Sequence, residues 1–543
     1  MSFGIYQVPP PVNEPVKGYA PGSPERRSLQ ARLASMAAER IEVPLVIGGK
    51  ELRTGRLAQA VMPHDHAHVL ADVHMGGEAE VALAIEAARK AKAAWSEMPW
   101  EQRVAIFLKA ADLLAGPWRD TLNAATMLNQ SKTCFQAEID SACELADFFR
   151  FNAHFYAQIL REQPESSAGV WNRTEHRPLE GFVFAATPFN FTSIAGNLPT
   201  APALTGNTVV WKPASTALLS AHYLMKLLEA AGLPPGVINL VPGSGRAVGD
   251  PVLASPELAG IHFTGSTAVF NGMWRTVGQN LDRYRVYPRL VGETGGKDFI
   301  LAHPSADVQA LAVAIVRGAF EFQGQKCSAA SRAYVPSNLW PRLKEILVPM
   351  VEGIAMGDVC DFSNFMGAVI DANSFQDQKG AIEEAKAAPD ASILVGGQCD
   401  DRKGYFVRPT IIETSNPHYR TLEVELFGPV ITLHVYPEDR WAETLRLVDE
   451  TSPYALTGAV FSQDRQAVLE AIRGLRNAAG NFYVNDKPTG AVVGQQPFGG
   501  ARKIGTNDKA GSMLNLLRWI SPRTIKETFV PATDYRYPFL AKD

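Results

Sequence analysis

The chain has 543 residues, of which 46% are hydrophobic and 20% are charged, and its formal net charge is -4. A chain of this length exceeds one hydrophobic core, so we expect two or three domains. The charged residues are scattered and nearly balanced in sign, which argues against a nucleic-acid partner.

The cysteines and the amino-terminal sequence indicate the cellular compartment in which the protein resides. Five cysteines, an odd number with irregular spacing, are typical of free thiols in a reducing environment. The first two dozen residues carry six prolines and no charged-then-apolar signal pattern. We therefore expect a cytoplasmic protein, or one of the mitochondrial matrix if a transit peptide has been removed.

The first predicted helix runs from Glu78 to Trp95, where apolar residues recur at helical spacing, and further amphipathic helices extend to about Phe155. Before it lie four histidines in a stretch that we expect to be a loop. Asp65 is the carboxylate beside His64 and His66, and no cysteine stands near the histidines, so we expect no metal site. The histidines are His64, His66, His68 and His74.

Short apolar runs alternate with helical segments in the next part of the chain. One such helix spans 217–231 and is ended by Gly232, with Pro234 following. Repeated strand and helix predict a doubly wound α/β sheet. The predicted strands begin at Phe182, Thr208, Gly236 and Leu258.

The segment 181–211 has no charged residue and is long enough to cross a membrane. It contains three prolines and three asparagines, so we predict buried strand, loop and helix of a water-soluble core instead. No membrane association is expected.

A second unit of the same α/β texture is predicted to begin with a strand at Arg289 and to continue with a helix from Asp307 to Phe322. Near the carboxyl end, 517–539 alternates apolar and polar residues, which favours an edge strand that pairs with another subunit.

Cys327, in Gly-Gln-Lys-Cys-Ser, and Glu293, in Gly-Glu-Thr-Gly-Gly-Lys, stand in glycine-rich sequence, which favours close backbone approach to a reacting group. A thiol nucleophile is also used by proteases and redox sensors. Those proteins usually need a histidine or a second cysteine within reach, and neither stands near Cys327 in the sequence. The pair therefore indicates a covalent thiol enzyme that uses a carboxylate base.

Seven motifs occur in an order that resembles the aldehyde dehydrogenase superfamily. They begin at Pro188 (PFNF), Trp211 (WKPAS), Phe263 (FTGST), Glu293 (ETGGK), Gly324 (GQKCS), Glu425 (ELFGP) and Pro497 (PFGG). The sequence from Gly494 to Asp508 further resembles the branch that oxidises L-glutamate gamma-semialdehyde, which forms from 1-pyrroline-5-carboxylate in proline breakdown.

The resemblance implies two doubly wound α/β domains and a small β extension for oligomerisation. The implied divisions are 1–165 for the amino-terminal arm and the helical part of the NAD-binding domain, 166–180 for part of an oligomerisation flap, 181–288 for the Rossmann-like NAD-binding core, 289–507 for the catalytic domain, and 508–543 for the carboxyl-terminal return with an oligomerisation strand. The family implies at least a homodimer.

The resemblance also implies the catalytic roles. Cys327 attacks the aldehyde, with a thiol pKa that we expect to be lowered by a nearby cation or helix terminus. The side-chain amide of Asn190 and the backbone N–H of Cys327 stabilise the oxyanion. Glu293, which two glycines would leave free to move, activates the water that hydrolyses the thioester.

The cofactor implied is NAD. Gly243-Ser-Gly-Arg-Ala-Val-Gly has its third glycine one position too late for the dinucleotide fingerprint, so the prediction does not depend on it. Lys212 and Glu425 would hold the ribose hydroxyls, and Phe427 would pack near the nicotinamide. Ser215 replaces the glutamate of many NAD-preferring relatives, which leaves some use of NADP open. The remaining implied cofactor-binding residues are Thr187, Pro188, Gly265, Ser266, Thr267, Ala268 and Val269.

For the substrate, the resemblance implies that a loop with Gly490 and Ala491 captures a carboxylate, aided by Ser328. Relatives often have serine in place of Ala491, so backbone amides would carry more of the anchoring. Phe498 would pack against the aliphatic chain of the substrate. Glu144 would lie near the substrate ammonium, unless Glu144 belongs to an ordinary exposed helix face.

Three alternatives remain open at this point. The chain could oxidise another semialdehyde or an aliphatic aldehyde. It could transfer the acyl group to coenzyme A, although that chemistry dispenses with the carboxylate base. It could also be a non-catalytic relative, which retention of Cys327, Asn190, Glu293, Lys212 and Glu425 argues against.

Overall fold

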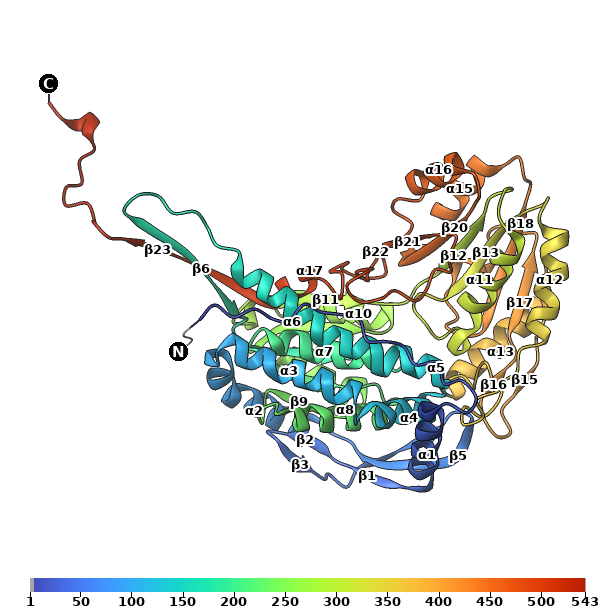
Figure 1. The fold of residues 1–543 in the computed structure, drawn as a ribbon, viewed down its shortest axis with the longest axis horizontal. Helices are drawn as coiled ribbons and strands as arrows, with labels where there is room; N and C mark the ends of the chain where they lie inside the picture. The colour runs from blue at the N-terminus through green and yellow to red at the C-terminus, as the bar shows by residue number, and fades with distance from the viewer. Residues whose placement is uncertain (1–3, 543) are drawn as a thin grey trace.

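The computed structural model describes residues 4–542 (Figure 1). Seven strands form a first sheet in the order β11-β10-β7-β8-β9-β2-β3. The five strands from β11 to β9 are parallel, and β2 and β3 add an antiparallel edge. Their bounds are β2 (Leu45–Ile47), β3 (Lys50–Leu52), β7 (Phe182–Ala186), β8 (Thr208–Lys212), β9 (Ile238–Leu240), β10 (Leu258–Thr264) and β11 (Arg289–Glu293).

Helices cover both faces of this sheet, because alternate side chains of a strand point to opposite sides. One apolar cluster joins alternate strand residues to α3 (Trp100–Ala115), α6 (Leu145–Arg161), α7 (Thr192–Leu204) and α8 (Leu218–Ala231). A second cluster joins the opposite strand residues to α2 (Glu78–Glu97), α9 (Gly245–Ala254) and α10 (Thr267–Gln279). The predicted doubly wound arrangement is therefore confirmed for this sheet.

A second seven-stranded sheet has the order β14-β17-β18-β13-β12-β20-β21, with only β14 antiparallel to its neighbour. Its strands are β12 (Asp298–Ala302), β13 (Ala330–Pro336), β14 (Ala391–Val395), β17 (Thr410–Thr414), β18 (Val430–Tyr436), β20 (Thr457–Phe461) and β21 (Asn481–Val484). The helices packed on it are α11 (Val308–Phe320), α12 (Trp340–Glu352), α13 (Ala372–Ala387), α14 (Arg420–Glu423), α15 (Trp441–Glu450) and α16 (Arg465–Gly474).

The strand at Arg289 differs from the prediction. We expected it to begin the second unit, but β11 pairs in parallel with β10, from Gly260 opposite Arg289 to Thr264 opposite Glu293, and so completes the first sheet. The second sheet begins with β12 instead. Local apolar character marks a buried strand but does not say which sheet the strand joins. The chain therefore crosses between the sheets at 294–297.

The stretch with the four histidines also differs from the prediction. Most of it is strand rather than loop, because β5 (Asp65–His74) lies between β1 (Ile41–Val43) and β4 (Leu57–Met62) in a three-stranded sheet. His64 precedes β5, and its ring Nδ1 lies 3.2 Å from the Ser131 hydroxyl. Within 4–542 the structure shows no group of three or more histidine, cysteine, aspartate or glutamate residues placed to hold a metal ion.

The uncharged run 181–211 forms β7, α7 and most of β8, with two of its prolines inside α7. Across 4–542, every helix is too short or too polar to span a bilayer.

A two-stranded antiparallel ribbon projects from the body of the molecule (Figure 1). It pairs β6 (Val170–Pro178) with β23 (Ile520–Thr528), so the predicted carboxyl-terminal strand finds a partner within its own chain. The remaining helices are α1 (Pro24–Ala38), α4 (Arg119–Gln130), α5 (Cys134–Ala137), the π-helical segment η1 (Glu138–Glu144), the 3-10 turns η2 (Leu281–Arg283), η3 (Glu321–Gly324) and η4 (Pro538–Leu540), and α17 (Met513–Leu517). The remaining strands form the short pairs β15 (Cys399–Asp400) with β16 (Phe406–Val407) and β19 (Tyr454–Ala455) with β22 (Ala501–Arg502).

Candidate active site

Two cavities meet at Cys327. The first, of about 490 Å³, is lined by η1, α6, the start of α7 and the segments 487–498 and 506–510. The second, of about 790 Å³, lies at the carboxyl ends of β7, β8 and β10, where open α/β sheets commonly bind ligands. Cys327 lines both cavities, so one residue borders both spaces.

The thiol lies in a turn just before β13, and Cys327 is only 6% exposed. We expected a lowered thiol pKa, and the structure contradicts this. Burial raises the pKa of the Cys327 thiol well above its usual value, and the carboxyl groups of Glu293, Asp298 and Glu425 raise it further. The neighbouring Lys326 does not compensate, because its ammonium pairs with Glu321 at 3.2 Å.

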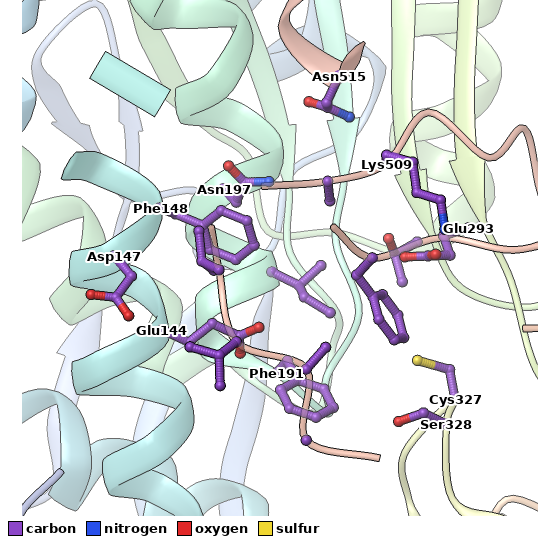
Figure 2. Close-up of a pocket in the computed structure, with 18 of the residues that line it drawn as sticks. Glu144, Asp147, Phe148, Phe191, Asn197, Glu293, Cys327, Ser328, Lys509 and Asn515 are labelled. Atoms are coloured by element: carbon purple, nitrogen blue, oxygen red, sulfur yellow. The ribbon is translucent and has the colours of Figure 1, made fainter. Parts of the chain in front are cut away.

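Glu293 ends β11 and lines the first cavity with Cys327. Burial raises the pKa of its carboxyl group to about 8, a shift that Lys509 opposes and Asp508 increases. Figure 2 shows Glu293 above the Cys327 thiol, with the Lys509 side chain extending towards the carboxylate. A carboxyl group with this pKa can exchange a proton near neutral pH, as a general base requires.

The two glycines after Glu293 allow close packing, and the freedom of movement predicted for Glu293 stays a prediction. A Cβ atom on Gly295 would lie 1.9 Å from Oε2 of Glu425, and one on Gly296 would lie 2.1 Å from the carbonyl oxygen of Cys327. The backbone N–H of Gly296 donates to Oε1 of Glu425 at 2.7 Å. The glycines therefore let Glu425 and the nucleophile approach the crossover backbone closely.

The Asn190 side chain is buried at the wall of the second cavity, beside Cys327. Its Nδ2 donates to the carbonyl oxygen of Gln325 at 3.1 Å, which fixes the amide close to the turn that carries the nucleophile. Because an amide nitrogen carries two hydrogens, this bond leaves a second one to donate to a ligand oxygen.

Most of the predicted cofactor residues line the second cavity, namely Thr187, Pro188, Lys212, Gly265, Ser266, Val269, Glu425 and Phe427. Three do not. Ser215 and Ala268 are exposed outside the lining, and the Thr267 hydroxyl donates to the Thr294 hydroxyl at 2.9 Å. The effect of Ser215 on NADP use stays a prediction.

The chemistry of the second cavity fits a dinucleotide. Lys212 and Glu425 offer a donor and an acceptor, and burial lowers the pKa of Lys212 to about 8 and raises that of Glu425 to about 7. The first turn of α10 follows directly on β10, and helix N-terminal amides attract phosphate groups. The phenyl ring of Phe427 offers an apolar surface near Cys327.

All five predicted substrate residues line the first cavity: Glu144, Ser328, Gly490, Ala491 and Phe498. The alternative that Glu144 lies on an ordinary exposed helix face is wrong. Its Oε2 accepts a hydrogen bond from the Ser193 hydroxyl at 2.7 Å, and burial, with Asp140 adding to it, raises the pKa of Glu144 to about 8. Figure 2 shows Glu144 on the side of the cavity opposite Cys327 and Ser328.

Comparison with known proteins agrees with this architecture. The profile described as "Aldehyde dehydrogenase family" matches residues 53–525. The chain belongs to the aldehyde dehydrogenase family. It is 53% identical over 541 residues to the mitochondrial delta-1-pyrroline-5-carboxylate dehydrogenase of Dictyostelium discoideum, covering 99% of this chain and 97% of that protein.

Two solved structures of delta-pyrroline-5-carboxylate dehydrogenase from Mycobacterium tuberculosis are similar to this aldehyde dehydrogenase over 100% of both chains, each at 57% identity. The TM-scores are 0.97 for one and 0.96 for the other, which is bound with NAD. The fold, with an NAD-binding sheet and a catalytic sheet, is thus that of an aldehyde dehydrogenase.

Several residues that line the cavities of this aldehyde dehydrogenase were not among the predicted site residues. Phe191 is the last residue of the PFNF motif and Lys509 directly follows Asp508, so both could have been found from motifs already recognised. The start of α9 lines the second cavity although its glycine loop misses the fingerprint spacing. Asn13 and Glu14 line the first cavity but come from an arm without periodicity, which gave no signal.

Proposed function

We propose that this protein oxidises L-glutamate gamma-semialdehyde, the open-chain form of 1-pyrroline-5-carboxylate, to L-glutamate with NAD, as a step in proline breakdown. The position of Cys327 carries the proposal, because this residue lines both the cavity that suits the substrate and the cavity that suits the dinucleotide. The full-length similarity to proteins named delta-1-pyrroline-5-carboxylate dehydrogenase supports the choice of substrate.

The first step joins sulfur to the aldehyde carbon. Glu293 accepts the thiol proton, the sulfur attacks, and the carbonyl π electrons move to oxygen to give a thiohemiacetal oxyanion. The free hydrogen of the Asn190 amide and the Cys327 backbone N–H donate to this oxygen. Fixed donors of this kind stabilise charge that develops in the transition state.

The thioester forms when a hydride leaves that carbon and the C=O bond reforms. NAD, when bound, supplies the acceptor for this hydride. Glu293 must first release the proton it took from the thiol, and it can then take a proton from water. The resulting hydroxide adds to the thioester carbon. The C–S bond then breaks, and the thiolate leaves with its electron pair. The carboxylic acid product keeps the water oxygen.

The substrate residues fit an amino acid aldehyde. Ala491 lacks a hydroxyl group, so the backbone amides of 490 and 491 and the Ser328 hydroxyl would bind the substrate carboxylate. Thr489 Oγ1 lies 2.8 Å from the Ser328 hydroxyl and orients it. Glu144 would accept from the ammonium, whose charge favours the ionised form of this carboxyl group. Phe498 would pack against the aliphatic carbons.

Lys212 and Glu425 would bind the ribose, with NAD preferred and some use of NADP permitted by Ser215. We further propose that the protein acts as at least a homodimer in a reducing compartment, either the cytoplasm or the mitochondrial matrix. The projecting β6–β23 ribbon supports the homodimer, and the five free cysteines support the reducing compartment.

The substrate panel is the decisive experiment. We expect kcat/KM for 1-pyrroline-5-carboxylate to exceed that for succinic semialdehyde or hexanal by at least about tenfold, because a site built to pair polar groups rejects ligands that lack them. Equal values would assign the protein to another semialdehyde or to aliphatic aldehydes. Product analysis with and without coenzyme A tests acyl transfer, and free glutamate in both reactions is the expected result.

A further inference from the structure

The amino-terminal arm forms part of the substrate cavity. Asn13, Glu14 and Val16 line it, although they stand more than 300 residues before the nucleophile in the sequence. Figure 1 shows this dark blue segment passing along α6 before it reaches α1. From residue 4 to residue 23 the arm forms no helix or strand, so its course is fixed by side-chain contacts.

Asn13 connects α6 and the segment 493–495 through a single amide. Its Nδ2 donates to Oδ2 of Asp147 on α6 and to the carbonyl oxygen of Val493, both at 2.8 Å. Its Oδ1 accepts from Nε2 of Gln495 at 2.9 Å. Val493 and Gln495 belong to the segment that continues from Gly490 and Ala491, so Asn13 ties the proposed carboxylate-binding loop to α6.

Glu14 anchors the arm beside this link. Its backbone N–H donates to Oδ1 of Asp147 at 2.7 Å, and its carboxylate pairs with Arg119 at 2.6 Å and with Arg150 at 2.8 Å. The Arg119 side chain is 2% exposed and also pairs with the fully buried Glu138 of η1. A buried, charge-paired anchor of this kind holds the Asn13 backbone in one place.

We propose that Asn13 is a positioning residue that sets the distance between the carboxylate-binding loop and α6, and thereby the preference for a substrate carrying both a carboxylate and an ammonium. This inference rests on the proposed function. Glu144 precedes α6 directly, so one substrate spans from the loop to the wall that Asn13 ties to it. Asn13 does not touch the reacting atoms, and the thiol chemistry is expected to continue without it.

The test is the Asn13→Ala variant. It removes three hydrogen bonds at the far end of the cavity, so we expect KM for 1-pyrroline-5-carboxylate to rise about tenfold. The kcat for that substrate, KM for NAD and kcat/KM for hexanal should stay within about twofold, because none of these depends on the loop position. A purely structural role would instead reduce kcat for both aldehydes together.

Two further variants keep the test decisive. Asn13→Asp retains the size and the acceptor for Gln495 but loses both donated bonds, so it should show the same selective rise in KM even if the alanine variant unfolds. Asn338→Ala, which removes an exposed asparagine bonded to Pro304 in the other domain, is the matched control and should behave as wild type.

The outcomes separate the two proposals. A wild-type protein without preference for 1-pyrroline-5-carboxylate over hexanal contradicts the proposed function and this inference with it. A wild-type protein with that preference, whose folded Asn13 variants keep it unchanged or lose activity on both aldehydes equally, contradicts the role of Asn13 alone.

Discussion

The reacting thiol of Cys327 is protonated at neutral pH in the free chain, because it is buried and three carboxyl groups raise its pKa. Attack on an aldehyde therefore needs a base. Glu293 lies in the same cavity, with a pKa of about 8 that lets it take a proton and release it again. One carboxylate can thus serve both the thiol and the hydrolytic water.

Glu293→Gln separates these two uses. We expect a first burst of reduced cofactor that forms more slowly than in the wild type, because water must then take the thiol proton, followed by slow turnover as thioester accumulates. Cys327→Ala should form no reduced cofactor at all. Rapid-mixing absorbance measures both, and steady turnover by the glutamine variant at the wild-type rate would remove Glu293 from hydrolysis.

The pH dependence of kcat follows from the same carboxyl group. Burial raises its pKa to about 8, and only the deprotonated form accepts a proton, so kcat should increase from pH 6 upwards and level off above about pH 8 where hydrolysis limits the rate. Asp508 adds to the raised pKa of Glu293, so Asp508→Asn should move the midpoint to lower pH. Buffer-matched steady-state assays measure this midpoint, and an unchanged or higher midpoint would contradict the assignment.

At the scale of elements, the crossover 294–297 between the two sheets brings the nucleophile and the cofactor carboxylate together. Gly295 and Gly296 leave no room for a side chain against Glu425 and against the Cys327 backbone. The sheet-to-sheet connection is therefore part of the active site as well as a link between domains.

Gly295→Ala tests this close approach. Its Cβ would collide with the Glu425 carboxyl group and displace it, so we expect KM for NAD to rise about tenfold or more, while KM for the aldehyde changes little. Gly278→Ala on α10 is the matched control, because a Cβ there meets no atom within 4 Å. Equal NAD affinity in both variants would show that Glu425 does not hold the cofactor.

Local sequence signals predicted the elements that are marked by periodicity and caps. The helix ended by Gly232 is α8, whose cap glycine has φ of 99°, and Asp307 caps α11 through the N–H of Ala310. The signals failed where pairing between distant segments decides the structure. The β1-β5-β4 sheet, the position of β11 in the first sheet and the course of the arm at Asn13 all depend on such pairing.

The site could be predicted to a similar extent. Motif residues such as Cys327, Glu425 and Gly490 line the expected cavities, because each motif holds its residues in a fixed local geometry. The pKa direction of Cys327 could not be predicted, because it depends on carboxyl groups up to about 100 residues away in sequence and on burial, which only the folded chain determines.

At the scale of the whole molecule, the β6–β23 ribbon and the tail beyond it extend away from the two sheets (Figure 1). The tail carries large apolar side chains that are exposed, including Phe529 at 61%, Tyr535 at 87% and Phe539 at 81%. Apolar surface concentrated on a projecting segment is typical of a protein interface.

We therefore expect light scattering to give at least twice the 59.0 kDa mass of one chain. Deleting residues 529–543 should weaken the assembly, so that dilution produces monomer at concentrations where the full chain stays associated. Activity at high protein concentration should be retained, because none of the described residues 529–542 lines either cavity. A monomeric full chain, or a deletion variant that resists dilution equally, would contradict this interface.

Cys327 borders two separate cavities, so a molecule can approach this residue from either one. The reduced dinucleotide can dissociate through its own cavity while the acyl group is still bound in the other cavity. Release of one product therefore does not block release of the other. An electrophile small enough to enter either cavity would modify the Cys327 thiol and inactivate the enzyme. An aldehyde mimic would fill the substrate cavity and protect the sulfur only from reagents that enter through that cavity. Two inhibitors that enter through different cavities should therefore compete for the sulfur without sharing a binding site.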